Sequence, residues 1–251
     1  MYPDLNIGPI SAHTFGLMFA LAFLAAGAVI GRRLGELGKP VDWAYEIVFA
    51  ALIGGVVGAR LYYVIQNNAY DSSELFSGSG LVWYGGAIGG TIGVCLWAAY
   101  RGFLGLTLLD LCAPALALGY AIGRIGCQLS GDGDYGKAWG GPWAMAYPDG
   151  TLPTRQEVHP TPIYETLAMG LGALLLWHLR DRFRAGILFA IYLIYAGAER
   201  FLVEFIRRND DVFAGLTTPQ LESLGMVLAG AAWIAIAARR GSLRAAAAPA
   251  G

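Results

Sequence analysis

The sequence predicts an all-α polytopic membrane protein with about seven transmembrane helices and a periplasmic cap segment. Composition and charge point to this fold class first. Of the 251 residues, 56% are hydrophobic and only 14% are charged, whereas a soluble domain carries about 25% charged residues. The 36 glycines follow no collagen-like period, so we assign them to packing between helices. This composition excludes a disordered chain and argues against a soluble globule.

Charge and cysteine content exclude several other classes of protein. The formal net charge is −1, so the chain lacks the basic field that attracts nucleic acid, and nucleic acid is not an expected partner. The chain has three cysteines, Cys95, Cys112 and Cys127. Their odd number argues against a disulfide framework, and their spacing is not that of a zinc site. The sequence also lacks nucleotide-binding loops and the common hydrolase motifs. We therefore expect neither a cofactor nor a metal.

Seven apolar runs predict the transmembrane helices. They are residues 14–31, 43–65, 84–100, 107–123, 164–179, 186–205 and 219–238. Each is close to the ~20 residues that a helix needs to cross the hydrocarbon of a bilayer. By its length, the run 107–123 is also compatible with a buried or re-entrant segment. Small-xxx-small pairs inside the runs indicate close helix packing: Gly54 and Gly58, Gly85 and Gly89, Gly86 and Gly90, and Gly119 and Gly123.

The basic residues set the expected orientation, because short cytoplasmic loops are enriched in Lys and Arg. Ten of the 17 basic residues fall in loops on one side or in the C-terminal tail. They are Arg32, Arg33, Lys39, Arg101, Arg180, Arg182, Arg184, Arg239, Arg240 and Arg244. The segment 1–13 and the loop 67–83, on the other side, contain none. We expect the amino terminus outside and the carboxyl terminus in the cytoplasm.

We expect a single integral membrane domain over residues 1–244 and a disordered tail at 245–251. The longest connection, residues 124–163, lies on the outward side and is predicted to form the cap. Its aromatic residues are Tyr135, Trp139, Trp143 and Tyr147. They favour an ordered element at the membrane interface, where aromatic rings settle. An aromatic belt without chemistry is the alternative.

Ionisable residues inside or at the ends of the apolar runs are the strongest functional signal. They are Glu46, Arg60, Asp110, Arg124, Glu165, Glu199, Arg200, Glu204 and Arg207. A charge at mid-membrane costs about 2.5–3.5 kcal/mol on insertion scales, so such residues normally face a partner or a wet cavity. Arg200, Glu204 and Arg207 recur at i, i+4 and i+7, which predicts that they share one face of the sixth helix.

Two interpretations of this charged face stay open. In one, Glu204 and an arginine neutralise each other between helices and have no further function. In the other, Arg124, Arg200 and Arg207 exceed the acids at the same depth. A guanidinium binds phosphate bidentately and stays charged in any environment. Surplus arginines therefore predict an anionic lipid headgroup as substrate or ligand.

Two further candidates give weaker signals. Asp132 and Asp134 offer two carboxylates to a divalent metal, but without more ligands nearby in the sequence they are better interpreted as solvated turn residues. Glu165 lies in the first turn of the fifth helix. A carboxylate there favours the positive end of the helix dipole, so a capping role competes with a catalytic one.

Three motifs resemble those of bacterial prolipoprotein diacylglyceryl transferases. They are GRIGCQLSG at 123–131, followed by Tyr135-Gly136, HPTPIYE at 159–165 and ERFLVEFIR at 199–207. The likeness extends to FGLM at 15–18, GAR at 58–60, GGAIGG at 85–90 and GLTTPQ at 215–220. It therefore covers nearly the whole chain.

The resemblance implies an enzyme of the bacterial inner membrane. It would transfer the diacylglyceryl group of phosphatidylglycerol to the lipobox cysteine of preprolipoproteins, forming a thioether and releasing glycerol phosphate. Its partners would be phosphatidylglycerol, the signal-peptide region of preprolipoproteins and membrane lipid. The resemblance assigns catalysis to Arg124, Arg200, Tyr84 and Glu204. It assigns substrate binding to Arg124, Cys127, Gly131, Asp132, Gly136, Arg207, Arg60 and Tyr164.

The sequence departs from the family pattern at several positions. Tyr84 replaces a histidine that many members carry, and a tyrosine with an ordinary pKa near 10 is a poor base at neutral pH. The group that takes the thiol proton is therefore left open. Cys127 and Ser130 replace asparagines, Phe15 replaces a tyrosine, and the segment 132–134 is one residue longer than the common form. The competing class is a non-catalytic anionic-lipid binder or transporter, although the internal repeats of many transporters are missing from the sequence.

Overall fold

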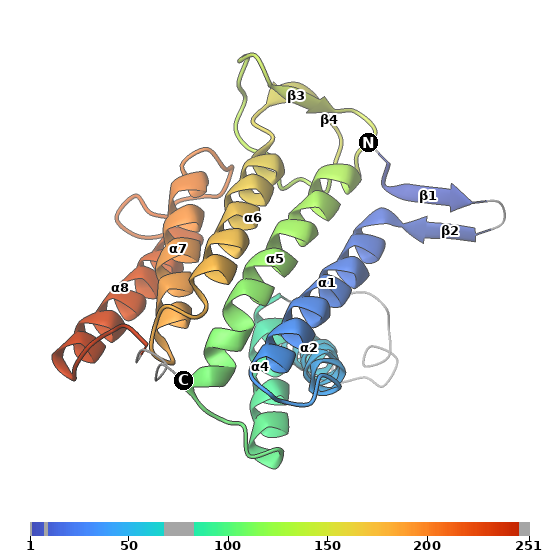
Figure 1. Ribbon diagram of the computed structural model, residues 1–251. Helices are drawn as coiled ribbons and strands as arrows, with labels where there is room; N and C mark the ends of the chain where they lie inside the picture. Colours follow the sequence, from blue (N-terminus) through green and yellow to red (C-terminus); the bar gives the residue numbers. More distant parts are fainter. Residues whose placement is uncertain (1, 8–9, 68–82, 246–251) are drawn as a thin grey trace. The chain divides into compact units, whose positions relative to one another are not determined.

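The computed structural model describes residues 2–7, 10–67 and 83–245, which are mostly helical (Figure 1). The helices are α1 (Thr14–Glu36), α2 (Trp43–Asn67), α4 (Trp83–Tyr100), α5 (Leu106–Ser130), α6 (Thr161–Leu179), α7 (Ile187–Glu204) and α8 (Thr218–Arg239). Two antiparallel hairpins are formed by β1 (Asp4–Ile7) with β2 (Ile10–His13), and by β3 (Met145–Tyr147) with β4 (Thr154–Val158). The predicted loop 67–83 and tail 245–251 lie almost wholly outside the described residues.

The prediction of a helical, multi-pass membrane protein is confirmed. Each apolar run contains a helix, and α1, α2, α5 and α8 are long and apolar enough to cross a membrane. The run 107–123 belongs to α5, which has 25 residues, so the re-entrant alternative loses its support. The other three helices have 18 or 19 residues. That all seven helices cross the membrane stays a prediction.

Two features differ from the expected fold. The chain is not purely helical, because it also contains the two hairpins. They were not predicted from the sequence. The fourth helix also continues to Ser130 and the next begins at Thr161, so the long connection is 131–160 rather than 124–163. The sequence places the end of the helix at its first charge, Arg124, but that charge is neutralised by acidic side chains from other segments, as described below.

The chain divides into two compact units, residues 1–26 with 109–251 and residues 27–108. In the second unit, glycines bring α2 and α4 into backbone contact. A Cβ on Gly58 would lie 2.3 Å from the carbonyl oxygen of Gly85, and one on Gly89 would lie 2.2 Å from that of Gly54. This confirms close helix packing as the role of these glycines. Gly123, by contrast, has no described heavy atom within 4 Å of its Cβ position.

Glu46, one of the ionisable residues in the apolar runs, has its partners within this second unit. Glu46 accepts hydrogen bonds from the Nε1 atom of Trp97 at 2.6 Å and from the Nε atom of Arg101 at 2.8 Å. The Nη2 atom of Arg101 also pairs with the second carboxylate oxygen of Glu46. Glu46 at the start of α2 and Arg101 just after α4 therefore neutralise each other's charge.

In the first unit, α5, α6 and α7 share one apolar core, and α8 packs on α7 (Figure 1). Asp110 of α5 is another ionisable residue of the apolar runs whose partners the structure shows. Its carboxylate accepts hydrogen bonds from the backbone nitrogens of Gly186 at 2.7 Å and Phe189 at 2.8 Å. These belong to the start of α7, whose first amides have no partner within the helix. Asp110 thus caps a neighbouring helix.

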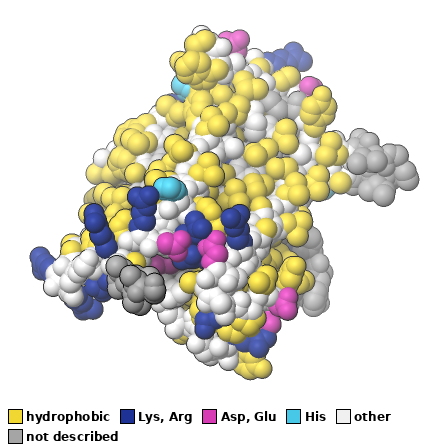
Figure 2. Space-filling model, in the orientation of Figure 1, with side chains coloured by type: hydrophobic (Ala, Val, Ile, Leu, Met, Phe, Trp, Pro, Cys, Tyr) yellow, Lys and Arg dark blue, Asp and Glu magenta, His cyan; other side chains and the backbone are white. Residues whose placement is uncertain are grey.

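The surface of α6 suits a lipid environment. Leu167, Leu171 and Leu174 follow the helical repeat and are 64–70% exposed. In Figure 2 several basic side chains gather around the end of α8. There the backbone nitrogen of Arg184 donates to the carbonyl oxygen of Leu243 at 2.9 Å. Basic residues of the loop after α6 and of the C-terminal segment therefore meet at one end of the unit.

The α2–α4 contact predicts a strong effect for a single methyl group. Gly89→Ala places a Cβ 2.2 Å from the carbonyl oxygen of Gly54, so the two backbones must separate. We expect the free energy of unfolding in detergent to fall by about 1–3 kcal/mol, as in other overpacked sites. Gly170→Ala in α6 is the matched control, because its Cβ meets no described atom within 4 Å, and its stability should be unchanged or slightly higher. Equal apparent Tm values for the two variants would contradict this packing.

Candidate functional site

Six charged side chains meet where α5 and α7 end and α6 begins. They are Arg124 of α5, Asp134 of the connection 131–160, Glu165 of α6, Arg200 and Glu204 of α7, and Arg207 just after α7. We call these six residues the arginine centre. All of them belong to the first unit. Helices that run in alternating directions thereby join residues that are far apart in the sequence.

Glu165 is in contact with all three arginines of the centre. Its side chain is fully buried and lies 3.2 Å from the Nε atom of Arg124, 3.2 Å from Nη1 of Arg200 and 3.5 Å from Nη1 of Arg207. Tyr120 adds a hydrogen bond from its hydroxyl group at 3.0 Å. Of the two roles left open for Glu165, capping loses its support, because the carboxylate contacts the arginines and α6 has no side-chain cap.

Asp134 links the connection 131–160 to two of the arginines. Its carboxylate pairs with Arg124 and, at 2.5 Å, with the Nη2 atom of Arg207. Its backbone oxygen accepts from Nη1 of Arg207 at 3.0 Å and from the hydroxyl of Thr161 at 2.5 Å. Burial would raise the pKa of Asp134, but the charges of Arg124 and Arg207 outweigh it and hold the pKa at about 2. The interpretation of Asp134 as a solvated turn residue is therefore wrong.

Glu204 connects the end of α7 to the start of α8. Its buried carboxylate lies 3.0 Å from Nη2 of Arg200 and 3.7 Å from Nε of Arg207. It also accepts a hydrogen bond at 2.9 Å from the hydroxyl of Thr217, the residue that caps α8. Arg207 was expected on one helical face with Arg200 and Glu204, but α7 ends at Glu204. The guanidinium reaches the same acids from the following turn.

The centre is balanced in charge, with three arginines and three carboxylates. The expected surplus of arginines is therefore wrong, because Asp134 and Glu165 were assigned other roles from the sequence. The ion pair expected between Glu204 and an arginine is present, and similar pairs involve all three arginines. Their side chains are only 10–21% exposed, and buried charges of this kind require such partners.

The connection 131–160 is ordered and has a small core of its own. Tyr135 and Tyr147 are buried and stacked, with ring centroids 4.7 Å apart. The ring of Trp139 stacks on His159 at 4.3 Å. The prediction of an ordered aromatic element is confirmed for these residues. Trp143, in contrast, is 59% exposed.

The same connection is fastened to the turn after α7. The backbone nitrogen of Lys137 donates to the carbonyl oxygen of Ile206 at 2.7 Å, and its Nζ atom donates to that of Phe205 at 3.0 Å. Gly136 is required there, because a Cβ would lie 2.4 Å from the carbonyl oxygen of Ile206. The segment that carries Asp134 and the turn that carries Arg207 are thereby held together.

Asp132 and Cys127 lie beside the arginine centre. The Sγ atom of Cys127 is 3.8 Å from Nη1 of Arg124. Ligand atoms of Cys127, Asp132 and Asp134 lie within 4.8 Å of one another. Two guanidinium groups already hold Asp134, so this trio offers a cation a poor set of ligands. We do not assign a metal to it.

The other predicted site residues have different surroundings. Gly131 adopts a left-handed conformation, with φ +60°, directly after α5. The hydroxyl of Tyr164 accepts a hydrogen bond from Trp143 at 2.7 Å. Arg60 and Tyr84 belong to the second unit, where the guanidinium of Arg60 lies 5.2 Å from the ring centroid of Tyr63 and Tyr84 is 39% exposed.

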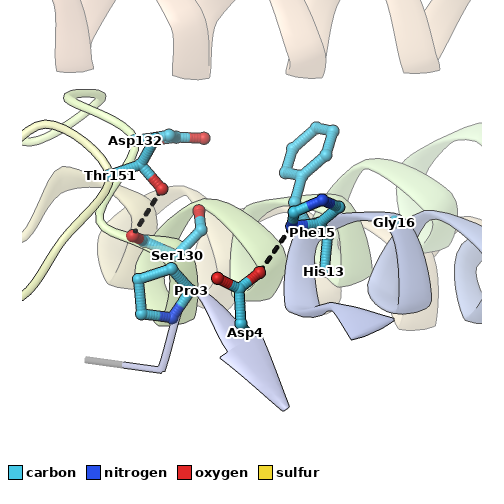
Figure 3. Close-up of a pocket in the computed structure, with 8 residues that line it drawn as sticks. All are labelled: Pro3, Asp4, His13, Phe15, Gly16, Ser130, Asp132 and Thr151. Carbon is cyan, nitrogen blue, oxygen red and sulfur yellow. Dashed lines mark hydrogen bonds and ion pairs between the residues drawn. The ribbon is translucent and has the colours of Figure 1, made fainter. Parts of the chain in front are cut away.

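A pocket of about 690 Å³ opens next to the end of α5 (Figure 3). One wall consists of Ser130, Asp132 and Thr151, and the hydroxyl of Thr151 donates to the carbonyl oxygen of Ser130 at 3.2 Å. The other wall includes His13, Phe15 and Gly16, and Asp4 bonds to the Nδ1 atom of His13 at 2.5 Å. The pocket thus combines carboxylates, an imidazole and an aromatic ring.

Sequence reasoning missed Tyr120 as a member of the site. Its hydroxyl accepts a hydrogen bond from Nη2 of Arg124 at 2.9 Å and donates to Glu165. The i, i+4 spacing of Tyr120 and Arg124 places both on one face of α5 and was the available signal. Thr217 was missed because its contact with Glu204 depends on how α8 packs on α7.

Fold and site define a multi-pass helical membrane protein with a buried, charge-balanced arginine centre beside a pocket. Ionisable residues held within apolar helices in this way mark functional sites of membrane enzymes and transporters. The family follows from comparison with known sequences. The chain belongs to the prolipoprotein diacylglyceryl transferase family, whose sequence model matches residues 4–236.

Curated relatives carry the same name over most of the chain. The phosphatidylglycerol–prolipoprotein diacylglyceryl transferase of Clostridium tetani is 34% identical in an alignment of 228 positions that covers 88% of this chain and 91% of the relative. The protein of that name from Bordetella parapertussis is 37% identical over 256 residues and 94% of each chain. The one from Geobacter sulfurreducens is 33% identical over 253 residues, again 94% of each chain.

The contacts of Glu165 predict that its charge holds the arginine centre together. Glu165→Gln keeps the shape of the side chain but leaves three arginines facing two acids. Loss of one partner from a buried ion pair costs about 3–5 kcal/mol, and we expect a fall of this size in the free energy of unfolding in detergent. Glu157→Gln is the control, because Glu157 is exposed in β4. Equal stability of both variants would refute this role.

The ion pairs of Asp134 predict a pH-dependent stability. Its pKa is about 2, against an ordinary value of 3.8, so its contribution is complete above about pH 4 and is lost as the pH falls towards 2. The difference in Tm between the wild type and Asp134→Asn should be constant from neutral pH to about pH 5 and shrink below pH 4. Asp149→Asn, at an exposed position of the same connection, should show no such trend. A difference that persists undiminished at pH 2 would contradict the assignment.

Proposed function

We propose that the chain transfers the diacylglyceryl group of phosphatidylglycerol to the lipobox cysteine thiol of preprolipoproteins. Family membership over residues 4–236 is the observation that carries the proposal. The curated relatives bear the name of this reaction. The arginine centre supports it, because the reaction requires a cationic site at the membrane for a phosphate ester.

The reaction forms one bond and breaks one. The thiol sulfur attacks the glyceryl carbon that bears the phosphate ester, a carbon–sulfur bond forms, and the carbon–oxygen bond breaks. The electron pair of that bond goes to the phosphate, which departs as glycerol phosphate with one additional negative charge. The thiol, with an ordinary pKa near 8.5, must also give up its proton. The site therefore has to stabilise an anion and accept a proton.

The contacts of Asp134 support phosphate binding at Arg124. Its carboxylate is an oxyanion that bridges Arg124 and Arg207, and phosphate favours the same guanidinium geometry. Asp134 is also the most accessible acid of the centre, since its side chain is 32% exposed whereas Glu165 and Glu204 are fully buried. A headgroup that took the place of the Asp134 carboxylate would contact Arg124 and Arg207.

Arg200 would stabilise the charge on the departing phosphate. Glu165 and Glu204 fix its guanidinium on two sides, so it is oriented before the reaction begins, as electrostatic stabilisation requires. Glu204 and Arg207 would position Arg200. Cys127, Gly131, Asp132, Gly136, Tyr164 and Arg60 are proposed to contact substrate, and Tyr84 to hydrogen-bond the lipid.

The proposed setting is the bacterial inner membrane, crossed by seven helices with the amino terminus in the periplasm. In this topology the residues 1–244 form the membrane domain, and the connection 131–160 caps it on the periplasmic side. The basic residues of the loop 180–184 and of the segment after α8 then lie in the cytoplasm, in keeping with the positive-inside rule. The arginine centre is at the opposite end of the first unit and faces the periplasm.

The test is a transfer assay with purified protein in vesicles that contain labelled phosphatidylglycerol and a lipobox peptide. The expected product is a peptide with a thioether-linked diacylglyceryl group. Loss of one preorganised charge partner typically costs about 10²–10³ in rate, and we expect losses of this size for Arg124→Ala and Arg200→Ala. Arg155→Ala, at an exposed position of β4, should retain wild-type activity.

Two results would contradict the proposal. Folded wild-type protein that forms no thioether but moves phosphatidylglycerol between leaflets would identify a transporter. Full activity of both arginine variants would show that the arginine centre does not take part in the transfer.

A further inference from the structure

The pocket beside α5 has the size of a site for a short segment of peptide, and its largely apolar lining carries a few polar groups. Its volume of about 690 Å³ lies within the range of ligand sites. Asp132, Ser130 and Thr151 form the wall nearer to the arginine centre, and Phe15 offers an apolar surface opposite (Figure 3). A cysteine side chain inside it would lie against the carboxylate of Asp132.

Asp132 also lies within reach of the centre proposed to hold the phosphate. Its carboxylate oxygen is within 4.8 Å of those of Asp134 and of the Sγ atom of Cys127. Cys127 in turn lies 3.8 Å from Arg124, and Asp134 pairs with the same arginine. A thiol at Asp132 and a phosphate ester at Arg124 would therefore be neighbours.

From this geometry we infer that Asp132 is the proton acceptor for the acceptor thiol, a role that rests on the proposed transferase function. The proton passes from sulfur to the carboxylate of Asp132 as the sulfur attacks the glyceryl carbon. The carbon–oxygen electron pair leaves with the phosphate, and the protonated Asp132 later releases its proton to water. No oxidant, reductant or metal takes part.

The neighbouring carboxylates are poorer candidates for this role. Asp134 is held by two arginines and has a pKa of about 2, which makes it a weak base. Glu165 is fully buried among three arginines. Within the described part of the chain, Asp132 makes no ion pair. Its lone pairs are therefore not committed to a guanidinium.

The charged and titratable groups around Asp132 favour the same assignment. Burial raises the pKa of Asp132 and the charge of Asp134 adds to this, whereas the hydrogen bond from Cys127 and the charge of Arg124 oppose it. A carboxylate with a raised pKa is a stronger base at neutral pH. Across the pocket, Asp4 already binds the Nδ1 atom of His13, and no described contact joins that pair to the arginine centre.

The test compares two acceptor peptides that differ only in the reacting atom, a cysteine or a selenocysteine. A selenol is already ionised at neutral pH and needs no base. General-base catalysis is worth about 10²–10⁴, so Asp132→Asn should lower kcat for the cysteine peptide at least 100-fold at pH 7. The loss should be less than about 10-fold for the selenocysteine peptide. With the cysteine peptide, the loss of kcat caused by Asp132→Asn should also become smaller as the pH rises past the thiol pKa near 8.5.

Asp149→Asn is the matched control, because it removes a carboxylate from an exposed position of the same connection. It should change neither rate nor pH profile. Equal losses for the two peptides would overturn the inference, as would an Asp132→Asn protein within twofold of the wild type. If His13→Asn rather than Asp132→Asn lost activity with the cysteine peptide but kept it with the selenocysteine peptide, the base would be His13, on the opposite wall of the pocket. Wild-type protein inactive with both peptides would refute the transferase function itself, whereas the first three outcomes refute only the role of Asp132.

Discussion

The neutralisation of buried charge at Glu165 is the constraint on which the functional end of the protein depends. One carboxylate without exposure to water contacts Arg124, Arg200 and Arg207 from three different segments. An isolated charge in this position would cost several kcal/mol. The ends of α5 and α7 are therefore held to the start of α6 by electrostatics, and Asp134 and Glu204 complete the balance with chain segments outside the helices.

Such a centre is not an efficient means of stabilising a fold. Replacing buried ion pairs with apolar residues is often neutral or stabilising, because desolvation offsets most of the attraction. The apolar helices already pack through a core such as that of Ala117, Met169 and Leu188. What the charges provide is a set of guanidinium groups fixed in place before an anion arrives, the arrangement that catalysis at a phosphate requires.

The sequence predicts helices better than it predicts partners. Long apolar runs located every helix of the described residues, and charges within them identified Arg124, Arg200, Glu204 and Arg207. Helix periodicity could not show that Asp134, ten residues beyond Arg124, folds back onto it, because a turn between glycines determines that contact. For the same reason the sequence left the role of Glu165 open between capping and catalysis: its partners are on other helices. Local rules describe segments, and the site is made of contacts between segments.

The tether of Asp134 has a consequence for turnover. Because Lys137 fixes this part of the chain to the carbonyl groups of Phe205 and Ile206, the carboxylate stays beside Arg124 and Arg207 as an intramolecular competitor. A short tether gives a group an effective concentration in the millimolar range or above. Any oxyanion must displace this carboxylate to bind, and the carboxylate returns when the oxyanion leaves. If the proposed transfer leaves its doubly charged product between these two arginines, the carboxylate of Asp134 would favour release of that product.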